Sequence, residues 1–90
     1  MSWQIEFTKN AQKAMEALDK PIRRHIDNFL SRLLSRENPR SIGGALSGTL
    51  AGRWRYRVGD YRIVCEIHDD VLVVLVLEVG HRREVYRRRS

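Results

Sequence analysis

Arginines alternate with apolar residues between Arg53 and Arg62, and they are the residues of this 90-residue chain best suited to chemistry. The order along the chain is Arg53-Trp54-Arg55-Tyr56-Arg57-Val58, then Gly59-Asp60, then Tyr61-Arg62. Successive side chains of a strand point to opposite faces, and glycine suits the first central position of a two-residue turn. The segment therefore predicts a hairpin in which Val58 lies opposite Tyr61 and Arg57 opposite Arg62.

The predicted hairpin has one apolar and one basic face. The apolar face, against the core, would carry Trp54, Tyr56, Val58, Tyr61, Ile63, Cys65 and Ile67. The basic face would carry Arg53, Arg55, Arg57 and Arg62, with Glu66 as its acid. Like charges opposite one another are destabilising, and guanidinium groups match phosphate oxygens, so we interpret this face as an anion site. The plainer alternative is a solvated basic face with ion pairs to the helices.

Metal-free cleavage of RNA is the chemistry that such a face could support. The three histidines show no metal-ligand spacing, and no acidic pair is placed to hold Mg²⁺, so we expect neither metal nor cofactor. RNA brings its own nucleophile, the 2′-hydroxyl, and needs cations for the developing phosphorane charge and groups that move protons. Arginine supplies the charge but is a poor proton acceptor. For proton transfer the sequence offers Tyr86, His81 and Glu84.

The first forty residues predict a strand and two helices. Trp3, Ile5 and Phe7 alternate with polar residues, which indicates a short strand. Apolar residues at helical spacing then predict a helix over about 9–18 with Thr8 as its N-cap. A second, stronger pattern predicts a helix over about 21–36, capped by Asp19 and joined to the first as an antiparallel hairpin.

The remaining segments complete an α+β domain over residues 1–90. Residues 38–52 contain four glycines in neither P-loop nor dinucleotide spacing, and they are interpreted as a connecting loop. The nearly continuous apolar run 71–79 predicts a buried, central strand that Gly80 ends. Residues 81–90 remain open between a strand, a helical turn and a loose end. The expected order is β-α-α-β-β-β, a helical hairpin on an antiparallel-rich sheet with a basic open face.

Composition suggests the partner and the compartment. The formal net charge is +6, and arginine outnumbers lysine 14 to 3, which favours a polyanionic partner such as nucleic acid, an acidic protein or an anionic membrane. Simple solubility is the alternative. A single cysteine excludes an intramolecular disulfide and fits a reducing cytosol. The start of the chain is not typical of a signal peptide, and no apolar run is long enough to span a bilayer, so we expect a cytoplasmic protein without membrane contact.

Two motifs together resemble a known family. The hairpin Trp-Arg-Tyr-Arg-Val-Gly-Asp-Tyr-Arg-Ile (54–63) and the segment Val-Gly-His-Arg-Arg-Glu-Val-Tyr (79–86) resemble the RelE/ParE superfamily of bacterial toxins, and more narrowly its RelE branch. The resemblance covers essentially the whole chain. It implies a ribosome-dependent mRNA endonuclease that cuts the A-site codon by 2′-hydroxyl attack, leaving a 2′,3′-cyclic phosphate without metal. It also implies a cognate antitoxin that wraps the toxin, with operator DNA met only through that antitoxin.

The resemblance also implies roles for individual residues. Arg62 and Arg82 match arginines that grip the scissile phosphate, and Tyr86 matches a tyrosine that stacks on the reacting nucleotide. Arg55 and Arg57 stand where the best-studied relative has two lysines, the second of which is proposed as general base. Arginine is a poor replacement for that lysine, so the proton acceptor stays open. The expected catalytic set is Arg55, Arg57, Arg62, Arg82 and Tyr86, and the expected RNA contacts are Arg53, His81 and Arg83, with the arginines of the second helix against ribosomal RNA.

Two other functions fit the same pattern. The ParE branch resembles the RelE branch in fold but poisons DNA gyrase, which is a binding function without RNA chemistry. A toxin remnant would act only as a partner for an antitoxin. Growth inhibition that survives Arg62→Ala and Tyr86→Phe would mean that the cleavage site assignment is wrong, and inhibition that follows gyrase sensitivity would favour the ParE branch.

Overall fold

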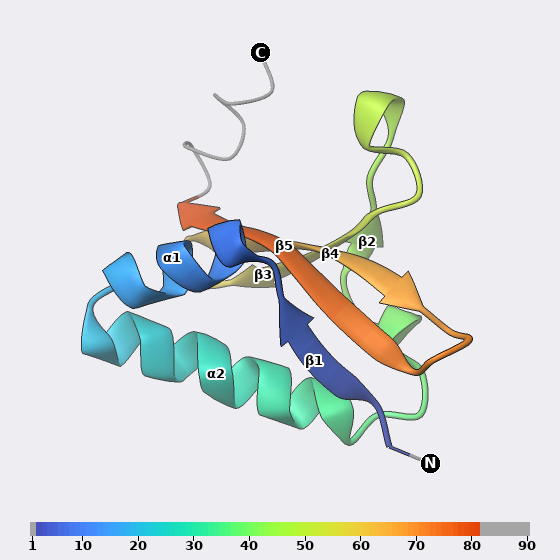
Figure 1. Cartoon of the computed structure of the whole chain (residues 1–90), viewed down its shortest axis with the longest axis horizontal. Helices are drawn as coiled ribbons and strands as arrows, with labels where there is room; N and C mark the ends of the chain where they lie inside the picture. Colours follow the sequence, from blue (N-terminus) through green and yellow to red (C-terminus); the bar gives the residue numbers. More distant parts are fainter. Residues whose placement is uncertain (1, 82–90) are drawn as a thin grey trace.

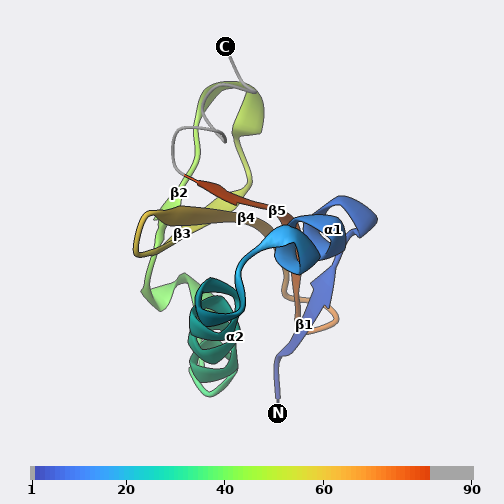
Figure 2. The same ribbon diagram turned by 90° about the vertical axis from the view of Figure 1, so that its left-hand side faces the viewer.

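The computed structural model describes residues 2–81, which form two layers. The elements are β1 (Gln4–Phe7), α1 (Lys9–Ala17), α2 (Lys20–Leu34), the 3₁₀ turn η1 (Pro39–Ser41), β2 (Gly44–Ala45), the 3₁₀ turn η2 (Gly48–Leu50), β3 (Trp54–Val58), β4 (Tyr61–His68) and β5 (Val73–His81). Both α-helices lie on one face of the sheet, and the chain reverses between them (Figures 1 and 2). The predicted α+β architecture is confirmed.

The sheet has the strand order β1-β5-β4-β3-β2. Strand β1 runs parallel to β5, and the other pairs are antiparallel. The apolar run therefore forms an interior strand, as predicted, but β5 begins at Val73 and continues through Gly80 to His81, so the prediction that Gly80 ends the strand is wrong. Strand β2 was not predicted, because two residues in a glycine-rich segment show no period. Together with η2 it forms an arm that rises from the sheet on the side away from the helices (Figure 2).

The two helices begin close to their predicted starts, but only one has the predicted side-chain cap. The Thr8 hydroxyl accepts a hydrogen bond from the Ala11 amide at 3.2 Å. Asp19 precedes α2 without a capping side-chain bond, so that part of the prediction is wrong. An N-cap side chain usually accepts from the second or third amide of the helix, and the second residue here is Pro21, which has no N–H.

The core lies between the helices and the sheet. Its fully buried side chains include Ala11 and Ile26 from the helices and Ile63 and Val76 from the sheet. Cys65 is also fully buried, and burial raises the pKa of its thiol, so it behaves as the small apolar residue that the sequence predicted. No helix among residues 2–81 is long and apolar enough to cross a membrane.

Three aromatic side chains bind the loop that follows α2 to this core. The Tyr56 hydroxyl donates to the Pro39 carbonyl at 2.6 Å, and the Trp54 indole donates to the Ile42 carbonyl at 2.7 Å. The Trp3 indole donates to the Glu37 carbonyl at 3.2 Å. The approach to β2 and β3, and with it the arginine-bearing hairpin, is thereby fixed to the core.

Replacing Tyr56 with phenylalanine is expected to lower the free energy of unfolding by roughly 1–3 kcal/mol, because the buried Pro39 carbonyl would lose its donor. Urea denaturation measures the change, with Tyr61→Phe as the control on a half-buried tyrosine of the same hairpin. Equal stability of Tyr56→Phe and the parent protein would contradict this role for the hydroxyl.

Candidate functional site

The β3–β4 hairpin has the predicted register. Val58 pairs with Tyr61, and Arg57 pairs with Arg62. Gly59 has a φ of 58°, the left-handed conformation that the first turn position requires. The arginines at 55, 57 and 62 thus share the sheet face opposite the helices, and they are called the arginine face below.

The three side chains of the arginine face differ in exposure. Arg57 is exposed, Arg55 is half-buried, and Arg62 is only 3% exposed. A guanidinium stays protonated even when buried, because its intrinsic pKa is very high. Charges also act more strongly where water is displaced. The centre of the cluster is therefore a buried cation beside an exposed one.

The unpredicted strand β2 packs against one of these arginines. Gly44 pairs with Arg55, and a methyl group at Gly44 would lie 3.1 Å from Arg55 Nη2. The guanidinium of Arg55 therefore lies close to the backbone of β2. A side chain larger than glycine at this position would displace it.

Arg53, a predicted RNA contact, has an acidic neighbour on the adjacent strand. Its Nε lies 3.8 Å from Glu66 Oε2, and Glu66 Oε1 lies 3.1 Å from His68 Nε2. The carboxylate of Glu66 thus offsets part of the charge of Arg53. This ion pair lies within the sheet and does not reach the helices.

His81 lies on the other side of the sheet from the arginine face. It pairs with Tyr61, whose ring it meets edge-on with centroids 5.6 Å apart. Tyr61 is directed to the helix side, so His81 is as well, whereas its neighbour Gly80 pairs with Arg62. The remaining predicted site residues, Arg82, Arg83, Glu84 and Tyr86, lie outside the described residues.

A β-bulge places an acidic residue, Glu78, on the arginine face, and it was not predicted there from the sequence. The β4–β5 register shifts so that Cys65 pairs with Val76 but Val64 pairs with Glu78, which leaves Leu77 as an extra residue. Glu78 consequently lies on the arginine face, and Val79 enters the core with 5% exposure. Strict alternation from Val76 would have put the charge of Glu78 into the core. A charged residue at a core position was the feature of the sequence that could have indicated the bulge.

Thr8 supports this bulge. Its hydroxyl donates to the Leu77 carbonyl at 3.2 Å while accepting from the Ala11 amide. One side chain thus begins α1 and satisfies a carbonyl at the irregular point of β5. The face on which Glu78 lies depends on contacts from the start of the chain.

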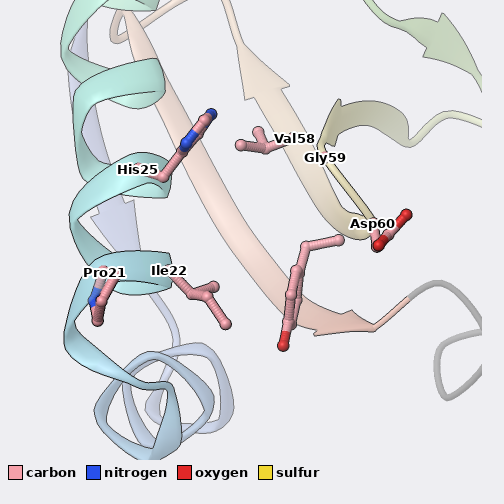
Figure 3. A pocket seen from close by; sticks show the side chains of 7 residues that line it. Pro21, Ile22, His25, Val58, Gly59 and Asp60 are labelled. Carbon is pink, nitrogen blue, oxygen red and sulfur yellow. The ribbon is translucent and has the colours of Figure 1, made fainter.

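A pocket of ≈ 370 Å³ lies between the start of α2 and the β3–β4 turn (Figure 3). It is lined by Pro21, Ile22, His25, Val58, Gly59, Asp60 and Tyr61. Val58 and Tyr61 belong to the helix side of the hairpin, so this pocket opens on the side opposite the arginine face. Within residues 2–81 no group of three or more His, Cys, Asp or Glu side chains is placed to hold a metal ion.

Comparison with known proteins identifies the family. The model of the family described as "ParE toxin of type II toxin-antitoxin system, parDE" matches residues 5–86. Toxin RelG of Mycobacterium tuberculosis is 35% identical over 88 residues, which are 98% of this chain and 100% of that protein.

Solved structures agree with the sequence matches. The toxin–antitoxin complex RelBE2 of Mycobacterium tuberculosis contains a chain with a TM-score of 0.81 and 29% identity, with coverage of 91% of this chain and 100% of that chain. A mutant of the Escherichia coli toxin RelE in the free state gives 0.77 and 27%, with coverage of 97% and 93%. The chain therefore belongs to the RelE/ParE family of toxins of type II toxin–antitoxin systems.

Proposed function

We propose that this toxin is a ribosome-dependent mRNA endonuclease that cuts the codon in the A site and so inhibits translation. The observation that carries the proposal is the pairing of Arg57 with the buried Arg62, with Arg55 on the same face. Two guanidinium groups side by side suit the non-bridging oxygens of one phosphate. The relatives named RelG and RelE-like support the same branch.

The proposed cleavage uses no metal ion. The 2′-hydroxyl of the A-site nucleotide attacks its own phosphate, and the products are a 2′,3′-cyclic phosphate and a 5′-hydroxyl. The phosphorane gathers negative charge as the bond forms, and fixed guanidinium groups lower its energy without having to reorganise. Arg82 and Tyr86 are proposed to complete the site, as second phosphate ligand and as stacking or proton-transfer group. Arg53, His81 and Arg83 are proposed RNA contacts.

The proposed partners are the ribosome, its mRNA and a cognate antitoxin. Several similar solved structures are toxin–antitoxin complexes, which supports an antitoxin for this chain as well. Operator DNA would be met only through that antitoxin. A function on the ribosome places the protein in the cytoplasm.

Ribosome binding is expected to weaken steeply with salt, because its contacts are mainly between arginine and phosphate. For about four such contacts the affinity should fall roughly 10²-fold between about 50 and 200 mM monovalent salt at constant Mg²⁺. Sedimentation with ribosomes measures this, and replacing the exposed Arg57 by alanine should lower the logarithmic salt slope by about one. A flat salt response would contradict phosphate-led binding.

Whether the toxin acts on translation or on gyrase is tested by assaying both targets with the same protein preparation. Purified, antitoxin-free protein is added to an in vitro translation reaction and to a gyrase supercoiling reaction. The proposal predicts cleaved mRNA and lost protein synthesis, with supercoiling unchanged. Intact mRNA with inhibited supercoiling would establish the gyrase-directed alternative. No effect in either assay would favour a toxin remnant that only binds an antitoxin.

A further inference from the structure

The acid on the arginine face is placed beside its buried cation. Glu78 is half-buried and shares a cross-strand row with Val64 and Arg55. In the next row Gly80 lies opposite Arg62. Because Gly80 has no side chain, Glu78 provides the nearest side chain that the described part of β5 places on that face beside Arg62.

The proposed cleavage lacks a proton acceptor among the arginines. A guanidinium does not give up its proton in a protein, so neither Arg55 nor Arg57 can accept the proton of the 2′-hydroxyl. Another acid on this face, Glu66, lies four residues further along β4, roughly 13 Å from Arg62. Diagonal neighbours in an antiparallel pair are about 7–8 Å apart, so a phosphate at Arg62 comes within reach of Glu78.

We infer, given the proposed mRNA cleavage, that the carboxylate of Glu78 accepts the proton of the attacking 2′-hydroxyl. The 2′-oxygen forms its bond to phosphorus as that proton moves to Glu78, and the bond between phosphorus and the 5′-oxygen breaks. The 5′-oxygen takes a proton from water, and the resulting hydroxide recovers the proton from Glu78. The bulge at Leu77 thus gives the arginine face a proton acceptor.

The charges around Glu78 are mostly positive. Strand β4 contributes Arg62 and Glu66, and β3 contributes Arg55 and Arg57 one strand further. On the other side of β5, β1 contributes Glu6 to this face, its paired part ends at Phe7, and the uncharged Thr8 follows. A carboxyl group is ordinarily ionised above about pH 5, so a base of this kind gives a flat rate profile at neutral pH.

The test is single-turnover cleavage of mRNA on programmed ribosomes between about pH 6 and 8.5, with Glu78→Gln, Glu78→Asp and wild type. Glu78→Gln is expected to cleave about 10²–10⁴-fold more slowly at pH 7 with unchanged ribosome affinity. Its rate should rise about tenfold per pH unit, since hydroxide must then take the proton. Wild type and Glu78→Asp should show flat profiles. Glu6→Gln, an exposed acid on the same sheet face, is the control and should match wild type.

Three results would overturn the inference while leaving the proposed function intact. These are a Glu78→Gln rate within about threefold of wild type, a slower rate with a flat pH profile, and a loss confined to ribosome affinity. The last two would mean that Glu78 acts through structure or charge. A wild-type protein that cuts no mRNA overturns the proposed function, and the inference with it.

Discussion

Replacing Arg62 by alanine is expected to slow mRNA cleavage on ribosomes about 10²–10³-fold and to abolish growth inhibition. Arg62 is the buried cation of the arginine face, opposite Arg57 and beside Gly80. A preorganised donor that faces developing charge in a water-poor site contributes effects of this size. Single-turnover rates measure the loss, and Arg62→Lys should recover part of it by restoring charge without the planar fork.

The control is Arg40→Ala, which removes one positive charge from η1, where it contacts Asp69 just after the end of β4. The Arg40 guanidinium donates to Asp69 at 2.9 Å and lowers the pKa of that exposed carboxyl. Arg40→Ala should cleave mRNA at close to the wild-type rate. Because Arg62 is buried, its variants are compared by thermal melting first. A folded Arg62→Ala protein that cleaves within threefold of wild type would contradict the site assignment.

Replacing Gly43 by alanine is expected to lower the free energy of unfolding by roughly 2–4 kcal/mol, through backbone strain and overpacking together. Gly43 has a φ of 85°, and its new methyl group would lie 2.7 Å from Trp54 Nε1 and collide with the Arg55 carbonyl. The hydrogen bond from Trp54 to Ile42 would have to move. Urea denaturation measures the stability, and cleavage assays show whether displacement of Arg55 also reduces activity.

Gly52 supplies the matched control for this substitution. Its φ is 90°, but no neighbouring atom lies within 4 Å of a methyl group there. Gly52→Ala should therefore show only the backbone cost, about 1–2 kcal/mol. Equal losses at Gly43 and Gly52 would mean that close contact with β3 contributes nothing.

The hairpin could be predicted from sequence because its signals are local. Strict alternation assigns each side chain to a face, and Gly59 fits the two-residue turn, so the pairing of Arg57 with Arg62 followed directly. The helices could be predicted for a similar reason, because apolar residues at helical spacing mark the one face of each helix that packs against the core. Asp19 is an exception, because the missing N–H of Pro21 outweighed the preference of aspartate for the cap.

Features that depend on distant contacts were not predictable. Strand β2 exists because Gly43 and Gly44 can approach Trp54 and Arg55, which composition alone does not reveal. The bulge in β5 depends on pairing with β4 and on Thr8 from the start of the chain. In a continuous apolar run no alternation shows which residues share a face. The face on which Glu78 lies therefore followed only from the register of β5 with β4.

Primer extension on an mRNA held on ribosomes with a known codon in the A site shows directly whether this toxin cuts that codon. We expect one new 5′ end inside that codon, and only when ribosomes and toxin are both present. A single 2′-deoxy nucleotide at the cut position should abolish the product, because the nucleophile is then missing. Equal cleavage of the 2′-deoxy mRNA would exclude the 2′-hydroxyl as nucleophile, and an mRNA that stays intact with the toxin would show that the protein is not an mRNA endonuclease.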